Sequence, residues 1–165
     1  MTGRTPGYQS GMEAPPRRTV HLLAVPLEVL VELQLYFDDM VRELQLIAVG
    51  QADAGAAHRL HRLAVHTQHE IARARNDLHV QARAGLDAGE PVADLVVDLR
   101  PSAVAASRAL IPLVDAFDEA SRVGELLAAP CTPRARQLLE WIVDEIEVQL
   151  VIGETPKPFT SEASA

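Results

Sequence analysis

Cysteine is almost absent from this chain. Cys131 is the only cysteine among 165 residues, so no disulfide can form within the chain. A thiol without a partner is typical of proteins in a reducing compartment. We therefore expect a cytoplasmic protein.

Basic charge is scarce relative to acidic charge. The 15 lysine and arginine residues are outnumbered by 23 aspartates and glutamates, which gives a formal net charge of -8. The resulting negative field repels nucleic acid phosphates and anionic membrane surfaces. The composition thus argues against nucleic acid as a partner and against binding to a membrane surface.

No uninterrupted apolar run is long enough to cross a membrane. The best candidate, residues 22–37, is broken by Pro26, Glu28 and Glu32, well short of the roughly 18 apolar residues that suggest a spanning helix. Arg17-Arg18 before it resembles part of an export signal, but no small-residue cleavage site follows. We expect neither a targeting segment nor a membrane span.

The motifs of common catalytic centres are also missing. The chain has no Gly-x-Ser-x-Gly nucleophile turn and no glycine-rich phosphate-binding loop, and Cys131 has no histidine near it in the sequence. No glutamate is followed by a histidine three positions later, as carboxylate-bridged di-metal helical proteins require. The sequence predicts a protein that is not an enzyme, with no cofactor and no metal site.

One domain with two tails fits a chain of this length. Residues 1–18 are rich in glycine, proline, serine and threonine without apolar periodicity, which predicts a disordered tail. Residues 154–165 are polar and contain two prolines, which predicts a flexible C-terminal tail. The folded domain is expected to span residues 19–153.

Four segments of this domain have helical periodicity. Apolar residues recur in them every three or four positions, as on one face of an amphipathic helix, over residues 26–49, 53–88, 101–123 and 132–152. Val20–Val25 and Val92–Leu99 are short strand-like runs that could pair with each other. The sequence predicts an all-α four-helix bundle that can carry a small two-stranded β ribbon.

A histidine-rich face on the second helical segment suggests an alternative function. His58, His61, His66 and His69 lie on the side opposite the apolar stripe, where a solvated polar face is the ordinary interpretation. His69 is followed by Glu70 and Ile71, as at the start of a histidine phosphoacceptor box. The alternative is a metal- or phospho-dependent helical protein that uses this face.

Charged residues on the first and fourth helical segments suggest a protein-binding surface. Complementary charge on such a surface tunes the choice of partner and the rate of encounter. We predict that a protein partner is bound by Asp38, Asp39, Arg42, Glu43, Trp141 and Asp144. The purely structural interpretation is that Arg42 pairs with Asp38 and that Trp141 covers a bundle edge.

A second apolar ridge runs along the first helical segment. Leu27, Val31 and Leu35 recur at i, i+4 and i+8, away from the residues that a four-helix core needs. Val148 lies off the core face of the fourth segment. We predict self-association through these four residues, as a symmetric homodimer. A third alternative is a small-molecule sensor that holds an apolar ligand in a core lined by Phe37, Met40 and Phe117.

The order of several short motifs resembles that of one group of bacterial proteins. The motifs are Val20–Pro26, Asp38–Leu44, Gly124–Leu127, Trp141 with Asp144–Glu145, and Pro156–Phe159. In order and spacing they resemble small actinobacterial helical regulatory proteins that are encoded beside ATP-binding anti-sigma-factor kinases and PP2C-type phosphatases. The histidine-rich stretch has no counterpart in that group.

The resemblance implies a function as well as a fold. It implies a non-enzymatic helical component of a partner-switching circuit, in which binding between signalling regulators controls transcription. The expected function is therefore that of a regulatory protein–protein interaction module.

Overall fold

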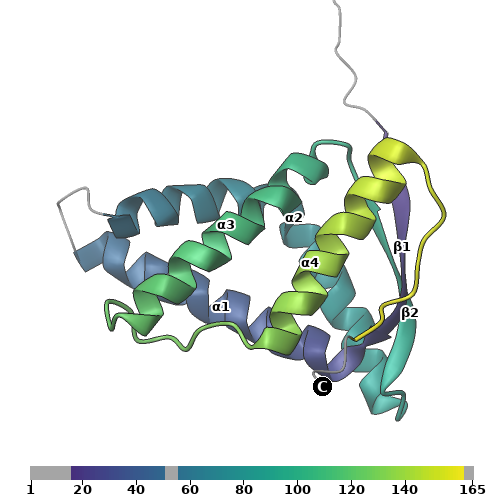
Figure 1. Cartoon of the computed structure of the whole chain (residues 1–165), viewed down its shortest axis with the longest axis horizontal. Helices are drawn as coiled ribbons and strands as arrows, with labels where there is room; N and C mark the ends of the chain where they lie inside the picture. Colours follow the sequence, from purple (N-terminus) through teal and green to yellow (C-terminus); the bar gives the residue numbers. More distant parts are fainter. Residues whose placement is uncertain (1–15, 51–55, 162–165) are drawn as a thin grey trace, which may run out of the picture.

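Within the residues that the structure describes, the chain forms four helices and one two-stranded sheet. The computed structural model describes the backbone of residues 16–50 and 56–161, and the side chains of residues 16–46 and 71–161. In chain order the elements are β1 (Arg18–Pro26), α1 (Leu27–Gly50), α2 (Ala56–Asp87), β2 (Val92–Leu99), α3 (Ala103–Arg122) and α4 (Pro133–Glu147), continued by the π-helical stretch η1 (Val148–Ile152) (Figure 1).

The last helix begins and ends at the capping and helix-ending residues that the sequence shows. Thr132 caps α4, because its hydroxyl accepts a hydrogen bond from the backbone N–H of Ala135 at 3.3 Å, and Pro133 occupies the first turn. Gly153 adopts a left-handed φ of 79° after η1, which glycine tolerates and which ends the helical path. The predicted helix start at Thr132 and Pro133 is confirmed.

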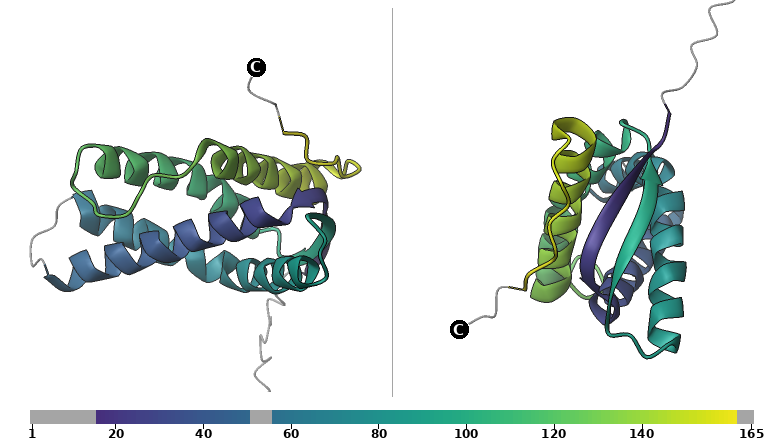
Figure 2. Two further views of the ribbon diagram at one scale, coloured as in Figure 1. Left: turned by 90° about the horizontal axis from the view of Figure 1, so that it is seen from below. Right: turned by 90° about the vertical axis from the view of Figure 1, so that its right-hand side faces the viewer.

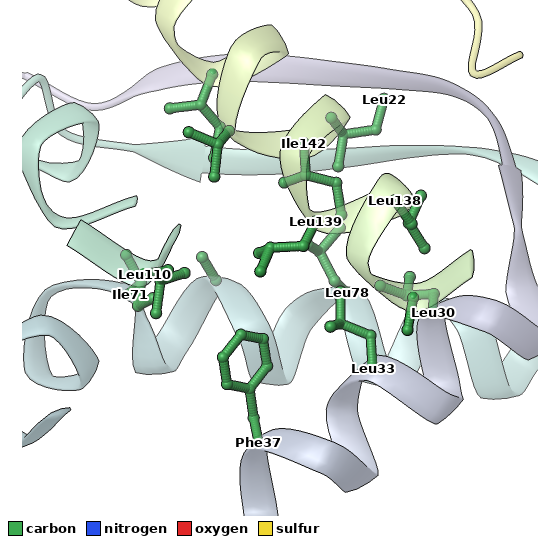
Figure 3. Packing of buried hydrophobic residues seen from close by; sticks show 14 of the residues in the cluster. Leu22, Leu30, Leu33, Phe37, Ile71, Leu78, Leu110, Leu138, Leu139 and Ile142 are labelled. Carbon is green, nitrogen blue, oxygen red and sulfur yellow. The ribbon is translucent and has the colours of Figure 1, made fainter. Parts of the chain in front are cut away.

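The helices pack around one apolar interior. Helices α1 and α3 each pack against both α2 and α4. Figure 3 shows side chains from α1, α2, α3, α4 and β1 facing the same interior, among them Phe37, Leu78, Leu110, Leu139 and Leu22. Burial of these residues is the main contribution to the stability of the fold.

The two strands pair antiparallel and close one side of this interior. Val20 pairs with Val97 and Leu22 with Leu95, and all four side chains are buried. The alternate residues point outward, as the two-residue period of a strand requires. In Figure 2 the ribbon lies between α4 and α2, and both helices contact it.

The fold is therefore mixed α/β and not the all-α bundle that the sequence predicts. The predicted β ribbon is confirmed, but it supplies one side of the core and is not an accessory to a helical bundle. The reason is that Val20, Leu22, Val97 and Leu99 bury their side chains among the helices. Periodicity within single segments does not reveal which element covers an open side of a core.

Glutamine side chains occupy both outer edges of the ribbon at the same register position. Gln149 bonds to both backbone polar groups of His21, with N···O distances of 2.9 and 2.7 Å. Gln81 does the same to Val96, the residue paired with His21, at 2.8 and 3.1 Å. Each amide satisfies edge groups that another strand would otherwise use.

The C-terminal segment differs from the flexible tail that the sequence predicts. Residues 154–161 follow β1, where the backbone N–H of Phe159 donates to the carbonyl of Leu23 at 2.9 Å. The ring of Phe159 packs edge-on against Trp141, with centroids 5.4 Å apart. An aromatic contact and a backbone hydrogen bond therefore hold this segment. Residues 162–165 and residues 1–15 of the predicted N-terminal tail lie outside the described residues.

Candidate functional site on helix α1

The outward side of α1 carries a row of exposed residues. Leu35, Asp39, Arg42 and Leu46 recur with spacings of four, three and four, which places them in one line along the helix. We call these four residues the α1 outer stripe. Leu35 is 53% and Leu46 68% exposed, although each has a large apolar side chain. In the left view of Figure 2, α1 lies at the front of the molecule.

A single ion pair lies at the centre of the stripe. The Arg42 guanidinium donates to the Asp39 carboxylate at 2.9 Å, and both side chains are more than half exposed. An exposed pair of this kind contributes little to stability, about 0 to 1 kcal/mol. Arg42 pairs with Asp39, whereas the structural interpretation of the sequence expected Asp38, so that expectation was wrong.

Asp38 lies on the α2 side of the stripe and has a different role. Its carboxylate accepts from Arg75 of α2 at 2.9 Å. Arg75 is mostly buried, and it also donates to Gln34 at 3.1 Å and lies over the Phe37 ring at 5.1 Å. Asp38 is therefore the outer end of a contact that joins α1 to α2. Sequence periodicity places Arg75 on α2 but does not predict this pairing.

Glu43, a predicted partner-binding residue, anchors a loop within the chain. Its carboxylate accepts hydrogen bonds from the backbone N–H groups of Leu127 and Ala128, in the connection between α3 and α4. Glu32 accepts from the Thr132 hydroxyl at the other end of that connection. The acidic edge of α1 thus holds the α3–α4 connection in place, and the Glu43 carboxylate is occupied within the chain.

A buried polar cluster lies beneath the same connection. The Asp118 carboxylate accepts from the Tyr36 hydroxyl at 2.9 Å and from the backbone N–H of Cys131 at 2.8 Å. Burial, and then the neighbouring Asp118 carboxylate, raise the pKa of the Cys131 thiol from 9.0 to about 12. Burial likewise raises the pKa of Tyr36. The thiol is therefore protonated near neutral pH and is a poor nucleophile.

The other two predicted partner-binding residues lie away from α1's outer side. Trp141 is half-buried on α4 and contacts Phe159 of the C-terminal segment, while Asp144 is exposed on α4. Trp141 therefore holds the chain's own C-terminal segment. The predicted surface divides: Asp39 and Arg42 form the stripe, Asp38 borders it, and Glu43 and Trp141 serve the fold.

The predicted self-association ridge is not continuous. Leu27 is fully buried, and its Cδ1 lies only 2.5 Å from the position that a Cβ on Gly85 would occupy. Val31 and Val148 are half-buried, and only Leu35 of the four is exposed. Leu27 belongs to the core because the end of α2 covers the first turn of α1, so its assignment to a self-association surface was wrong.

No metal site is present among the described residues. No group of three or more histidine, cysteine, aspartate or glutamate side chains lies close enough together there to hold an ion. The side chains of His58, His61, His66 and His69 lie outside the described residues. The alternative function on that face therefore stays a prediction.

A small apolar cavity lies in the described part of the core. Its volume is about 60 Å³, and Leu33, Phe37, Leu78 and Leu139 are among the residues that line it. Pockets for drug-sized ligands usually measure about 300 to 1,000 Å³. A cavity of this size does not accommodate such a ligand, so the ordinary core interpretation of Phe37 is favoured.

The described chain is mostly helical with a two-stranded antiparallel sheet, and its α1 carries exposed apolar and charged residues in one line. None of the described helices combines the length and the apolar character needed to cross a membrane. No protein family, curated protein or solved structure was found to match the chain.

Proposed function

We propose that this protein is a non-enzymatic regulatory module that binds another signalling protein through the α1 outer stripe, within a bacterial partner-switching circuit that controls transcription. The observation that carries the proposal is the exposure of Leu35 and Leu46 on either side of the Asp39–Arg42 pair. Large apolar side chains flanking a charged centre provide both buried area and selectivity when a partner covers them.

The flanks of the stripe support this proposal. On one flank Asp38 is joined to Arg75 of α2, and on the other Glu43 is joined to the backbone of the α3–α4 connection. Both flanks are thus fixed within the chain. A surface held in this way loses little conformational freedom on binding, which favours affinity.

The motifs that carry the family resemblance contact one another in the fold. Glu43 of the Asp38–Leu44 motif binds the backbone of Leu127, which ends the Gly124–Leu127 motif. Phe159 of the last motif contacts both Trp141 and the carbonyl of Leu23 in the first. These contacts support a shared scaffold as the origin of the resemblance. The partner class that the resemblance implies is a signalling regulator of a partner-switching circuit.

A charge exchange on the stripe tests the proposal. In the double variant Asp39→Arg with Arg42→Asp, the ion pair is kept but its order along α1 is reversed. We expect the variant to fold normally and to bind its signalling partner at least about tenfold more weakly. The reason is that each exchanged charge now faces a charge of the same sign on the partner. The partner is first captured from a lysate of the source organism with the wild-type chain, then purified and titrated by calorimetry.

The chain offers a matched control on α3. Glu119 and Arg122 form an exposed pair with the same i, i+3 spacing, at 2.7 Å. Glu119→Arg with Arg122→Glu applies an equivalent exchange outside the stripe and should leave binding unchanged. Equal loss in both exchanges, or no loss in the α1 exchange, would remove the α1 outer stripe as the partner surface.

A further inference from the structure

The α1 outer stripe is complementary to itself when its direction is reversed: apolar positions fall on apolar ones, and the acidic position falls on the basic one. From Leu35 to Leu46 the order is apolar, acidic, basic and apolar, arranged at equal distances about the midpoint between Met40 and Val41. When two such helices lie antiparallel, Leu35 of each meets Leu46 of the other and Asp39 of each meets Arg42 of the other. A contact between identical surfaces around a two-fold axis needs this self-complementarity.

The spacing of the stripe fits that arrangement. Separations of four, three and four residues are those of the core positions of a coiled coil. They keep one line of side chains facing a neighbouring helix over about 17 Å of helix length. From this we infer that the α1 outer stripe forms an antiparallel, two-fold contact with α1 of a second copy of this chain.

The surroundings of the stripe remove the main electrostatic obstacle. Asp38 and Glu43 border the stripe, and unpaired carboxylates there would repel those of the second copy. Asp38 is already paired with Arg75, and Glu43 already accepts two backbone hydrogen bonds. On the part of α1 whose side chains the structure describes, the central charges of the stripe are Asp39 and Arg42, which attract each other between copies.

Further apolar surface lies beside the stripe. The Leu127 side chain is fully exposed, and the backbone of this residue is held by Glu43 on the α3–α4 flank. In the antiparallel arrangement this flank faces the equivalent flank of the second copy. The contact remains short, which places it among weak, reversible interfaces with dissociation constants in the micromolar range.

The inference does not depend on the proposed signalling partner, and the two can fail separately. The double exchange Asp39→Arg with Arg42→Asp reverses the charges that a partner meets, but it keeps opposite charges facing each other in the dimer. This variant should therefore lose the partner and keep the dimer. Loss of both properties in this variant would contradict the dimer geometry.

Single charge reversals test the geometry directly. D39R alone presents only arginines at the centre of the contact, and R42D alone presents only aspartates. Each alone should weaken dimerisation at least about tenfold, because both central pairs become repulsive. An equimolar mixture should form a heterodimer with close to wild-type affinity, because arginines then face aspartates. Sedimentation equilibrium over micromolar to millimolar concentrations measures all three samples.

Substitution of two exposed apolar residues by glutamate, together with a test of folding, completes the experiment. Leu35→Glu should abolish the dimer, whereas Val80→Glu, at a comparably exposed site on α2, should not. Circular dichroism melts confirm that each variant is folded, and the rescue in the mixture cannot arise from misfolded chains. A monomeric wild type over the whole range, or D39R and R42D that fail to rescue each other, would overturn the inference.

Discussion

Replacing Leu27 by alanine is expected to lower the free energy of unfolding by about 3 to 5 kcal/mol. Leu27 is fully buried in the first turn of α1, against Gly85 near the end of α2. Truncation of this side chain leaves a cavity. Because α1 and α2 are packed against each other, they cannot move together enough to fill it. Leu35→Ala, two turns further along the same ridge, should change stability by no more than about 0.5 kcal/mol. Urea unfolding of both variants measures the difference.

A second substitution shows whether Gly85 is the neighbour that makes Leu27 part of the core. Gly85→Ala places a methyl group against the Leu27 side chain and should destabilise the fold, although alanine favours helix. Combined with Leu27→Ala, the same change should cost less than the sum of the single effects. If Leu27→Ala and Leu35→Ala both changed the free energy of unfolding by a small and equal amount, Leu27 would be as exposed as Leu35. That result would contradict the burial of Leu27 by α2.

Replacing Asp118 by alanine is expected to cost about 2 to 5 kcal/mol. Asp118 is buried and accepts from both Tyr36 and the backbone of Cys131, so its loss leaves two half-buried donors without this acceptor. Asp118→Asn keeps an oxygen acceptor at this position and should cost less. Thermal and urea unfolding of the two variants give the comparison.

The thiol of Cys131 reports the same cluster without unfolding the protein. With its pKa raised to about 12, the wild-type thiol should react slowly with an aromatic disulfide at mildly alkaline pH, and faster only as pH rises toward that value. Asp118→Ala removes the nearby carboxylate and loosens the connection, so the reaction should accelerate. An Asp118→Ala variant as stable and as unreactive as wild type would show that the cluster does not hold the α3–α4 connection.

The helices and the ribbon were predictable because their signals are local. Residues facing one side of a helix or strand recur with a fixed period, and prolines and glycines mark the ends. The roles of Leu27 and Leu35 were not predictable in this way, because both belong to one ridge and only the position of α2 separates them. Periodicity within α1 carries no information about how far α2 extends along it.

The candidate surface was predictable in part for the same reason. Asp39 and Arg42 were correctly placed on an exposed face, since helical spacing alone decides that. Glu43 and Trp141 have equally polar or amphipathic side chains, but long-range neighbours, the α3–α4 connection and Phe159, occupy them. Such pairings join residues far apart in the sequence, and a single sequence shows no sign of them.

The most direct test of the account is to map where a bound partner touches the chain. Amide resonances of the isotope-labelled protein are followed by NMR as the captured signalling partner is added. We predict that the largest shifts fall on α1 from Leu35 to Leu46 and on the adjoining residues Arg75 and Leu127, with little change in the outer residues of the ribbon or in α3. Shifts concentrated on α3 or on the outer face of the ribbon, with α1 unchanged, would contradict the assignment of α1 as the binding surface.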